Sequence, residues 1–477
     1  MLDKTRTKPV ILIGLVLLAF LGGWFVVSGR AWGNLMIAAA WGGYLGISWI
    51  EIKDGSTPVS FHTPLLTSLM VVLAVYGIVL YLGSYFWGAF LIIGAVVIYS
   101  LEKGLHDGVD ELKVSLKGSL KNIMIPFLGL VSALIIGIFI LLATGYDPIE
   151  TYAALFYGGL FKNWSVAVLN ATPLIFTGLS VAFAFQAGLF NIGAEGQYYI
   201  GAMVAAFLGL YLHLPPLFTI LIVIIVAGLC SAAWNFVPAL LKVRTGAHEV
   251  ITTMMLAHVA RYLSPIFIRA FGGNPTTSKH AYVTDPILES SWLPRFKGFL
   301  PHANYRLHIG IIIAIGFALG VYYILYKTRI GFEIRAIGQN PNAARVQGIS
   351  IGKNIFIALL FSGFLSGMAG VVQVLGLDHK MFLNLAGGYG WNGISVALLA
   401  SNNPIAVIFT ALLWGALDAG GQYMVRVTDT PNSIVEIIKG IILFLIVARY
   451  IYIYIGNRLR RRKERQHEEK SLAGGRA

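Results

Sequence analysis

The chain has 477 residues, of which 57% are hydrophobic and only 12% are charged, and its mean hydropathy is +0.76. Ordinary soluble domains carry about 25% charged residues, so this composition excludes a soluble globular protein. The net charge is +14, and the placement of lysine and arginine along the chain accounts for it without a nucleic-acid partner.

Apolar runs recur along the chain, and most of them are long enough to cross a hydrocarbon core of about 30 Å as a helix. They do not alternate with period two, so we expect helices, whose backbone polar groups are satisfied internally in lipid. The sequence predicts an all-α, polytopic membrane protein with about 14 transmembrane or re-entrant helices. The predicted spans are 10–27, 32–50, 64–82, 85–101, 123–143, 166–186, 196–214, 216–241, 249–268, 307–326, 354–378, 386–400, 404–424 and 434–455.

The first four spans have short loops and predict an accessory transmembrane bundle in residues 1–101. Residues 102–121 are polar and predict a cytoplasmic linker, and residues 122–456 hold about ten spans with richer polar content. Most of the 35 lysines and arginines lie in segments that the predicted spans place on the same side of the membrane as the N-terminus. Positive charges favour the cytoplasmic side, so both termini are predicted to be cytoplasmic. The tail 457–477 contains "RLRRRKER", and we expect its charges to meet anionic membrane lipid.

Motifs of soluble enzymes fail on spacing. "GISIGKN" has three residues between its glycines where a phosphate-binding loop needs four, and Asn354 replaces the magnesium-binding Ser or Thr. "HEVIT" has Thr252 where a second zinc ligand would stand. The single cysteine, Cys230, allows no disulfide and no cysteine metal site. We therefore expect no catalytic residue, no metal and no cofactor.

The stretch "FQAGLFNIGAEGQYYIGA" (Phe185–Ala202) places polar side chains at membrane depth. Its glycines weaken a continuous helix, and unwound backbone persists in a membrane only where protein or water satisfies it. An ionisable residue such as Glu195 at that depth is a functional hypothesis by default. The alternative is structural: Glu195 lies in the first turn of a helix and its carboxylate can cap free N–H groups there.

A second polar stretch, Thr328–Asn354, lies between two predicted spans on the cytoplasmic side. Asn340 and Pro341 predict a helix cap followed by the first helical position, and Gly348 stands at a natural helix end. We expect a short, exposed, capped helix, which is suited to a groove on a partner protein.

Four motifs in this order resemble the permease subunits of bacterial ABC importers for ribose-like sugars, nucleosides and branched-chain amino acids. They are "TPLIFTGLSVAFAFQAGLFNIGAEGQ", "GAHEVITTMML", "GFEIRAIGQNPNAARVQGI" and "NNPIAVIFTALLWGALDAGG". The "FNIGAEGQ" form is closest to the nucleoside type. The resemblance covers about residues 120–456, makes 122–456 the permease core, and does not extend to the bundle 1–101.

The resemblance implies that the chain lies in the bacterial cytoplasmic membrane. It also implies three partners: a separate ABC ATPase subunit, a second permease subunit, identical or different, and an extracytoplasmic solute-binding protein. It also implies that the loop 328–354 couples to the ATPase. The coupling residues carried over are Gly331, Glu333, Arg335, Gly338, Asn340, Pro341, Ala343, Ala344 and Gly348.

Polar and aromatic side chains suit the hydroxyls and base edges of a nucleoside. The predicted substrate-pathway residues are Asn170, Asn191, Glu195, Gln197, Gln373, Trp391 and Asn392. For each of them the alternative is an interhelical hydrogen bond. The spacing also predicts a Glu436–Lys439 pair, and close helix packing at Gly316 with Gly320 and at Gly363 with Gly367.

The most consistent function is therefore the transmembrane subunit of an ATP-driven importer of a small polar solute, most simply a nucleoside. A simple sugar or a branched-chain amino acid is the alternative solute. An ion-coupled secondary transporter, with Glu195 carrying a proton, is the alternative of another class, but it leaves the capped cytoplasmic loop unexplained. A membrane-embedded enzyme would need a paired acid and base at one depth, and no spacing indicates one.

Overall fold

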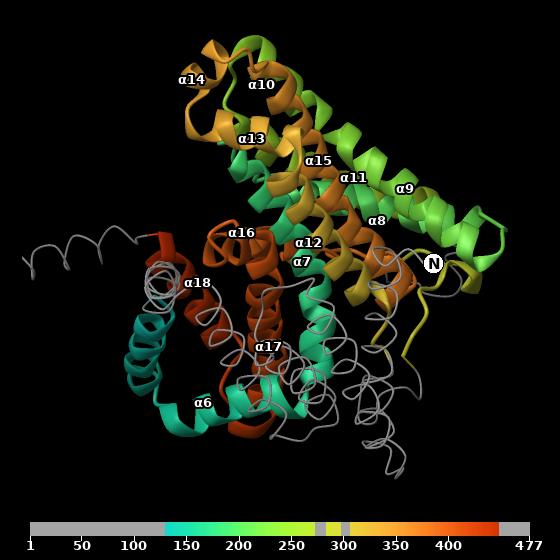
Figure 1. Cartoon of the computed structure of the whole chain (residues 1–477). Helices are drawn as coiled ribbons and strands as arrows, with labels where there is room; N and C mark the ends of the chain where they lie inside the picture. The colour runs from blue at the N-terminus through green and yellow to red at the C-terminus, as the bar shows by residue number, and fades with distance from the viewer. Residues whose placement is uncertain (1–128, 272–282, 297–305, 448–477) are drawn as a thin grey trace, which may run out of the picture. The chain divides into compact units, whose positions relative to one another are not determined.

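A computed structural model of the chain describes residues 129–271, 283–296 and 306–447 (Figure 1). All of them belong to one of two compact units, the one formed by Ile125–Phe296 and Asn304–Ala477. The predicted spans of residues 1–101, the linker 102–121 and the tail 457–477 lie outside the described residues.

The described residues are helical apart from loops, one short 3-10 turn (Glu289–Ser291) and two isolated β-bridges. An apolar helix at Gly129–Ala143 comes first. In chain order the others are α6 Pro148–Phe156, the π-helix η1 Tyr157–Lys162, α7 Trp164–Gln186, α8 Ala194–Tyr211, α9 Pro216–Trp234, α10 Phe236–Thr245, α11 Glu249–Phe271, α12 Gly310–Lys327, α13 Arg329–Gln339, α14 Pro341–Val346, α15 Ile351–Val372, the π-helix η3 Gln373–Asp378, α16 Tyr389–Leu399, α17 Pro404–Thr428 and α18 Ser433–Val447.

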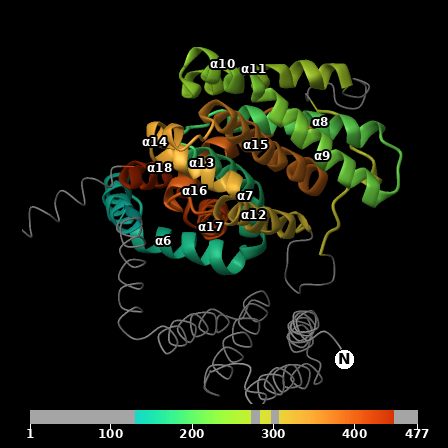
Figure 2. The ribbon, with the colours of Figure 1, turned by 45° about the horizontal axis from the view of Figure 1, so that its top comes forward.

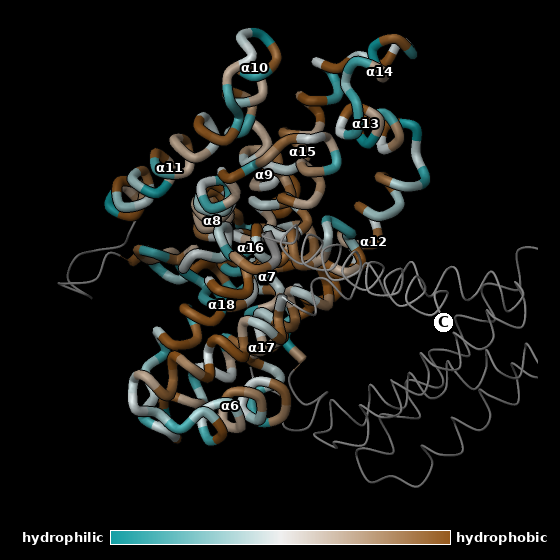
Figure 3. The backbone as a smooth tube through the Cα atoms, turned by 90° about the vertical axis from the view of Figure 1, so that its left-hand side faces the viewer, coloured by the Kyte–Doolittle hydropathy of each residue, from teal (hydrophilic) through white to brown (hydrophobic). Residues whose placement is uncertain are grey.

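Six helical stretches of the described residues are long and apolar enough to cross a membrane: 164–186, 216–245, 249–271, 310–327, 351–378 and 404–428. Figure 3 shows the hydrophobic colour along these helices. Within the described residues, each predicted span from 123–143 onward coincides with a helix to within a few residues, while 123–128 and 448–455 lie outside them. The all-helical membrane fold is therefore confirmed, whereas the total of about 14 helices and the cytoplasmic termini stay predictions.

Helix α7 is the central element of this unit. Its residues are mostly apolar around the whole circumference and almost entirely buried, as expected for a helix with no solvent-facing stripe. It packs against α12, α15, α16 and α17 (Figure 2). Buried hydroxyls find partners in this core: Ser362 Oγ on α15 donates to the Ser180 carbonyl oxygen on α7 at 2.8 Å and lies 2.9 Å from Ser180 Oγ.

Small residues allow the helices to approach closely. A Cβ atom added at Gly367 of α15 would overlap Ser231 of α9, and one added at Gly363 would meet Ser231 and Asn235. The predicted close packing at Gly363 and Gly367 is therefore confirmed. The same prediction for Gly316 and Gly320 of α12 stays a prediction, because no described residue lies within 4 Å of a Cβ added at either position.

One end of the unit gathers α10, α13 and α14, which all contact α15, while α6 lies at the opposite end beside α17 (Figure 1). The end of α10 carries Lys242 and Arg244, so the basic side predicted to be cytoplasmic also holds the polar stretch 328–354. Helix α6 was not expected from the sequence. Asp147 caps it by accepting from the N–H groups of Ile149 and Glu150, and Pro148 occupies its first position.

Candidate functional site: the turn between α7 and α8 and the coupling segment

Helix α7 ends in a turn that needs glycine. Gly188 has a φ of +72°, and the N–H of Leu189 donates to the carbonyl of Ala184 at 3.0 Å. This left-handed helix end satisfies the last carbonyls of α7. The chain then runs through Asn191 to Gly193 and re-enters a helix as α8, so the predicted break between the two helices is present.

Two buried amides hold this turn in shape. Asn191 Nδ2 donates to Gln197 Oε1 at 2.9 Å, and Gln197 Nε2 donates back to Asn191 Oδ1 at 3.0 Å. Asn191 Nδ2 also donates to Ser362 Oγ at 2.7 Å. Asn191 and Gln197 are 0% and 1% exposed. In this conformation both side chains therefore bind the protein itself, which matches the structural alternative for them.

Glu195 binds the start of another helix. Its carboxylate accepts from the N–H of Gly388 at 3.1 Å and from the N–H of Gly390 at 2.7 Å. These N–H groups stand at the beginning of α16, where free donors and the positive end of the helix dipole favour a carboxylate. Glu195 is 7% exposed. It therefore fixes the helix whose first turn carries Trp391 and Asn392, both half-buried.

The remaining predicted pathway residues lie apart from the amide pair. The Tyr389 hydroxyl on α16 donates to Asn170 Oδ1 on α7 at 3.5 Å. Gln373 Nε2 donates to Asp378 Oδ2 at 2.7 Å within the π-helix η3. The structure thus groups Asn191 with Gln197, links Glu195 and Asn170 to α16, and places Gln373 in a separate contact.

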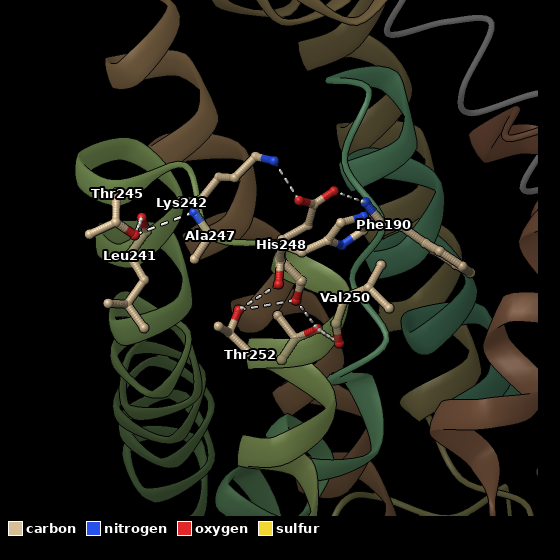
Figure 4. A network of polar contacts seen from close by, with 10 residues as sticks. Phe190, Leu241, Lys242, Thr245, Ala247, His248, Val250 and Thr252 are labelled. Atoms are coloured by element: carbon tan, nitrogen blue, oxygen red, sulfur yellow. Dashed lines mark hydrogen bonds and ion pairs between the residues drawn. The ribbon is translucent and has the colours of Figure 1, made fainter.

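The carboxylate of Glu249 ties the turn to two more helices (Figure 4). It lies at the start of α11, and its Oε2 is 2.7 Å from Lys242 Nζ at the end of α10. Its Oε1 accepts from the N–H of Phe190 in the turn at 3.5 Å. Glu249 belongs to the "HEVIT" sequence, and this ion pair gives it a structural role. No group of three His, Cys, Asp or Glu among the described residues could hold a metal ion.

The coupling segment consists of two short helices rather than one. Thr328 caps α13 by accepting from the N–H of Gly331 at 3.2 Å. Asn340 Oδ1 caps α14 by accepting from the N–H groups of Asn342 and Ala343, both at 3.1 Å, and Pro341 is its first residue. Gly348 follows with a φ of +78°. The predicted cap, first position and helix end are therefore confirmed.

The turn and the coupling segment touch backbone to backbone. A Cβ atom added at Gly188 would lie 3.2 Å from the Cα of Gly338, and one added at Gly338 would overlap the carbonyl oxygen of Gln186. Gly331 lies equally close to α12, where a Cβ atom would overlap the carbonyl of Ile324. Gly331 and Gly338 are therefore both required for α13 to pack against the spanning helices.

Some predicted coupling residues face inward. Ala344 is 3% exposed. Arg335 Nε donates to the carbonyl of Leu325 at 3.0 Å, and its guanidinium lies 4.9 Å from the centre of the Tyr326 ring. Glu333 accepts from Asn354 and from Arg329, each at 2.9 Å, and these bonds hold the pKa of Glu333 below its usual range.

The outward surface of the segment around α14 includes four of the predicted coupling residues. The exposed positions between 340 and 348 are Asn340, Pro341, Asn342, Ala343, Arg345, Val346, Gln347 and Gly348. Val346 is 89% exposed, and sequence reasoning did not single it out. An apolar residue at the end of a capped, amphipathic segment was the signal that could have found it.

A cluster of four side chains lies just before α12 and just after η3, at the ends of these helices away from the coupling segment. Its members are Trp292, Arg295, His308 and His379. The Trp292 and His379 rings stack with centroids 4.0 Å apart, and Arg295 donates to His379 Nε2. His308 Nδ1 accepts from the N–H of Gly310 at 3.1 Å. Burial, aided by the nearby Arg295 charge, lowers the pKa of His308 to about 4 and that of His379 to about 4.

The sequence of this chain matches a known protein family. The family model described as "Branched-chain amino acid transport system / permease component" matches residues 164–447. The chain is 33% identical over 354 residues to the guanosine ABC transporter permease protein of Bacillus subtilis (strain 168), over 72% of this chain and 98% of the relative.

Two further relatives cover similar lengths. A nucleoside ABC transporter permease protein of Lactococcus lactis subsp. cremoris is 33% identical, over 69% of this chain and 92% of the relative. A glucose ABC transporter permease protein of Haloferax volcanii is 30% identical, over 69% and 88%. No solved structure matches the chain. The chain therefore belongs to this permease family and is a non-catalytic, membrane-spanning subunit of an ABC transporter.

Proposed function

We propose that the chain passes a nucleoside across the bacterial cytoplasmic membrane, driven by a separate ATPase subunit that binds the coupling segment 328–354. The observation that carries this proposal is the contact between Gly188 and Gly338. It joins the turn that orders α7, α8 and α16 directly to the segment with the outward-facing Val346. A displacement of α13 by an ATPase would therefore reach the helices that surround the polar turn.

The choice of solute rests on the relatives and on the residues available. Relatives at 33% identity are named for guanosine and for nucleosides. Trp391 and Asn392, half-buried in the first turn of α16, offer an aromatic face and an amide, which suit a base and a ribose. A simple sugar is the second candidate, because the relative at 30% identity is named for glucose.

The contacts of Glu195 argue against a proton-coupled transporter. Its two carboxylate oxygens accept from the N–H groups of Gly388 and Gly390 and so fix the start of α16. A proton carrier would have to lose and regain a proton while keeping α16 in place. An ATPase-driven importer needs no such change, and it gives α13 and α14 a role.

The proposed complex contains this chain, a second permease subunit, an ATPase subunit and an extracytoplasmic solute-binding protein. We expect cells that express the complex to take up labelled guanosine and uridine, and labelled glucose and leucine far more slowly. Uptake should stop when ATP is depleted and should survive a protonophore. Uptake that a protonophore abolishes while ATP remains high would instead support the ion-coupled alternative.

A pair of matched variants tests the ATPase contact. Val346→Asp places a charge on the outward surface of α14, and we expect it to reduce co-purification of the ATPase at least fivefold. Val243→Asp makes the same change on α10 at the same end of the unit, where Val243 is 40% exposed, and should retain the ATPase. Equal retention by both variants would exclude α14 as the contact.

A further inference from the structure

Helix α11 carries charge where a lipid-facing helix cannot. Its buried face is formed by Thr253, Ala257, Ala260, Ser264 and Ile268, and these residues pack it against the unit. Arg261 and His258 are both exposed on the other side. Neither residue was among the pathway residues predicted from the sequence.

Arg261 stands in the middle of a helix that is long and apolar enough to span a membrane. At 1.5 Å per residue it lies about 18 Å from the first residue of α11 and about 15 Å from the last. A guanidinium at that depth is too far from either interface to reach it by extending its side chain. Because charged residues at the centre of a bilayer face protein or a water-filled cavity, we expect the part of α11 around Arg261 to face one of these and not lipid.

The exposed surface of α11 divides into two strips. One strip is apolar, with Met255, Val259, Tyr262 and Ile266 between 45% and 72% exposed. The other holds His258 and Arg261, which lie three residues apart and therefore on neighbouring positions of the helix surface. Lipid suits the first strip, and only the second requires a polar environment.

The polar strip is continuous with the loop that leads into α16. Arg261 Nη2 donates to Asn384 Oδ1 at 3.3 Å, and Asn384 is exposed with a φ of +61°. Four residues later the chain reaches Gly388, which donates to Glu195. The charged side chain of α11 is therefore held beside the same short segment that the polar turn fixes in place.

We propose that His258, Arg261 and Asn384 line a water-filled path along the exposed face of α11 and that Arg261 contacts the passing nucleoside. The solute class rests on the proposed function. A guanidinium presents five N–H donors and no acceptor, so it favours solutes rich in acceptor oxygens and nitrogens, such as base carbonyls, ring nitrogens and ribose hydroxyls. Its fixed charge also repels metal cations and protons from the path.

Accessibility of single cysteines tests the path. In a chain with Cys230→Ser, the variants His258→Cys and Arg261→Cys are compared with Val259→Cys and Ile266→Cys on the apolar strip of the same helix. The complete importer in membrane vesicles is treated with a charged, membrane-impermeant thiosulfonate. We expect the first pair to react at least tenfold faster than the second pair, and guanosine to slow the reaction at residue 261. Equally slow labelling at all four positions would overturn the path, and fast labelling that guanosine leaves unchanged would overturn the solute contact.

Uptake measurements separate this inference from the proposed function. Arg261→Leu should lower guanosine uptake at least tenfold while the ATPase still co-purifies, and Arg261→Lys should retain a third or more of it. If the unmodified importer takes up no nucleoside, the proposed function fails although the labelling contrast remains. If it takes up nucleosides and Arg261→Leu does so equally well, only this inference fails.

Discussion

The turn between α7 and α8 and the coupling segment α13–α14 are both polar stretches between apolar helices, yet they use their polar groups in opposite ways. In the turn, Asn191, Glu195 and Gln197 are buried and their hydrogen bonds end on protein groups. In the coupling segment, the caps are satisfied locally and α14 exposes most of its surface. In this conformation the polar groups of the turn hold its shape, whereas those of the coupling segment leave an exposed surface, which is where we propose that the ATPase binds.

The two regions meet where α13 contacts the turn, and Gly338→Ala at this junction should have the largest effect. The added methyl group would overlap the carbonyl oxygen of Gln186, so α13 must move away from the turn. The proposed link between the ATPase and the spanning helices would then be disturbed. We expect uptake to fall at least tenfold while the ATPase still co-purifies.

Gly316→Ala is the control for this variant, because no described residue lies within 4 Å of the added atom. It introduces the same methyl group in a spanning helix and should leave uptake within about twofold. A Gly338→Ala variant that transports as well as Gly316→Ala would show that the contact carries no motion.

Acidification probes a third region, the histidine cluster, which lies outside both the turn and the coupling segment. His308 is neutral in the folded protein down to a pKa of about 4, whereas the unfolded histidine binds a proton below about 6.5. The unfolded state therefore binds more protons between these values, and stability falls as the pH drops from about 6.5 to about 4. The shift corresponds to about 3 kcal/mol of the free energy of unfolding.

Thermal unfolding in detergent at pH 7.5, 6.5, 5.5 and 4.5 measures this loss. His308→Asn keeps an acceptor for the N–H of Gly310 but cannot gain a proton, so its unfolding temperature should depend less on pH across this range. Parallel curves for the two proteins would assign the acid sensitivity to other groups.

Within the turn, Asn191→Leu should destabilise the unit by about 1–3 kcal/mol, because it leaves the buried amide of Gln197 without its partner. The double variant Asn191→Leu with Gln197→Leu should cost less than the sum of the two single changes, since it removes both polar groups. Unfolding temperatures of the four proteins give the coupling. Additive losses would mean that the amide pair does not act as one unit.

Glu195→Gln removes the charge and keeps the shape of the side chain that caps α16. Carboxylates at helix starts contribute about 1 kcal/mol, so uptake should fall by less than tenfold with normal insertion. Glu195→Asp keeps the charge but shortens the reach to Gly388 and Gly390, and it shows whether charge or geometry dominates. Unchanged uptake in Glu195→Gln would remove the charge from the mechanism.

The smallest effect is expected from removal of the N-terminal residues. A chain that begins near Leu116 loses four predicted spans, an even number, and retains Lys117 and Lys121 before the span 123–143. The orientation of the remaining helices should therefore be kept, and uptake should fall by less than about threefold. Loss of uptake at normal membrane levels would place residues 1–101 in the path or in a subunit contact.

The sequence predicted those features that depend on neighbouring residues. Helix spans follow from apolar length, and the cap at Asn340, the start at Pro341 and the end at Gly348 follow from bonds that reach only two or three residues. The break after Gly188 was expected for the same reason. The family resemblance rested on motifs that are each short and continuous.

The partners of the polar residues could not be predicted, because they are far away in the chain. Asn191 binds Ser362, 171 residues later, and Glu195 binds Gly390, 195 residues later. Arg261 was only a charge inside a span until the structure placed it on the exposed side of α11. Lys439 was expected to pair with Glu436 and does so at 2.8 Å, but it also pairs with Asp418 of α17 at 2.7 Å.

The contact between Gly188 and Gly338 has a mechanical consequence. Side chains can absorb a push by changing rotamer, but two glycines meet with peptide atoms alone, and a peptide group is a stiff, planar unit. The contact therefore leaves little room for α13 to move without the turn after α7. If an ATPase displaced α13 and α14, the end of α7 would have to shift with them for the contact to be kept.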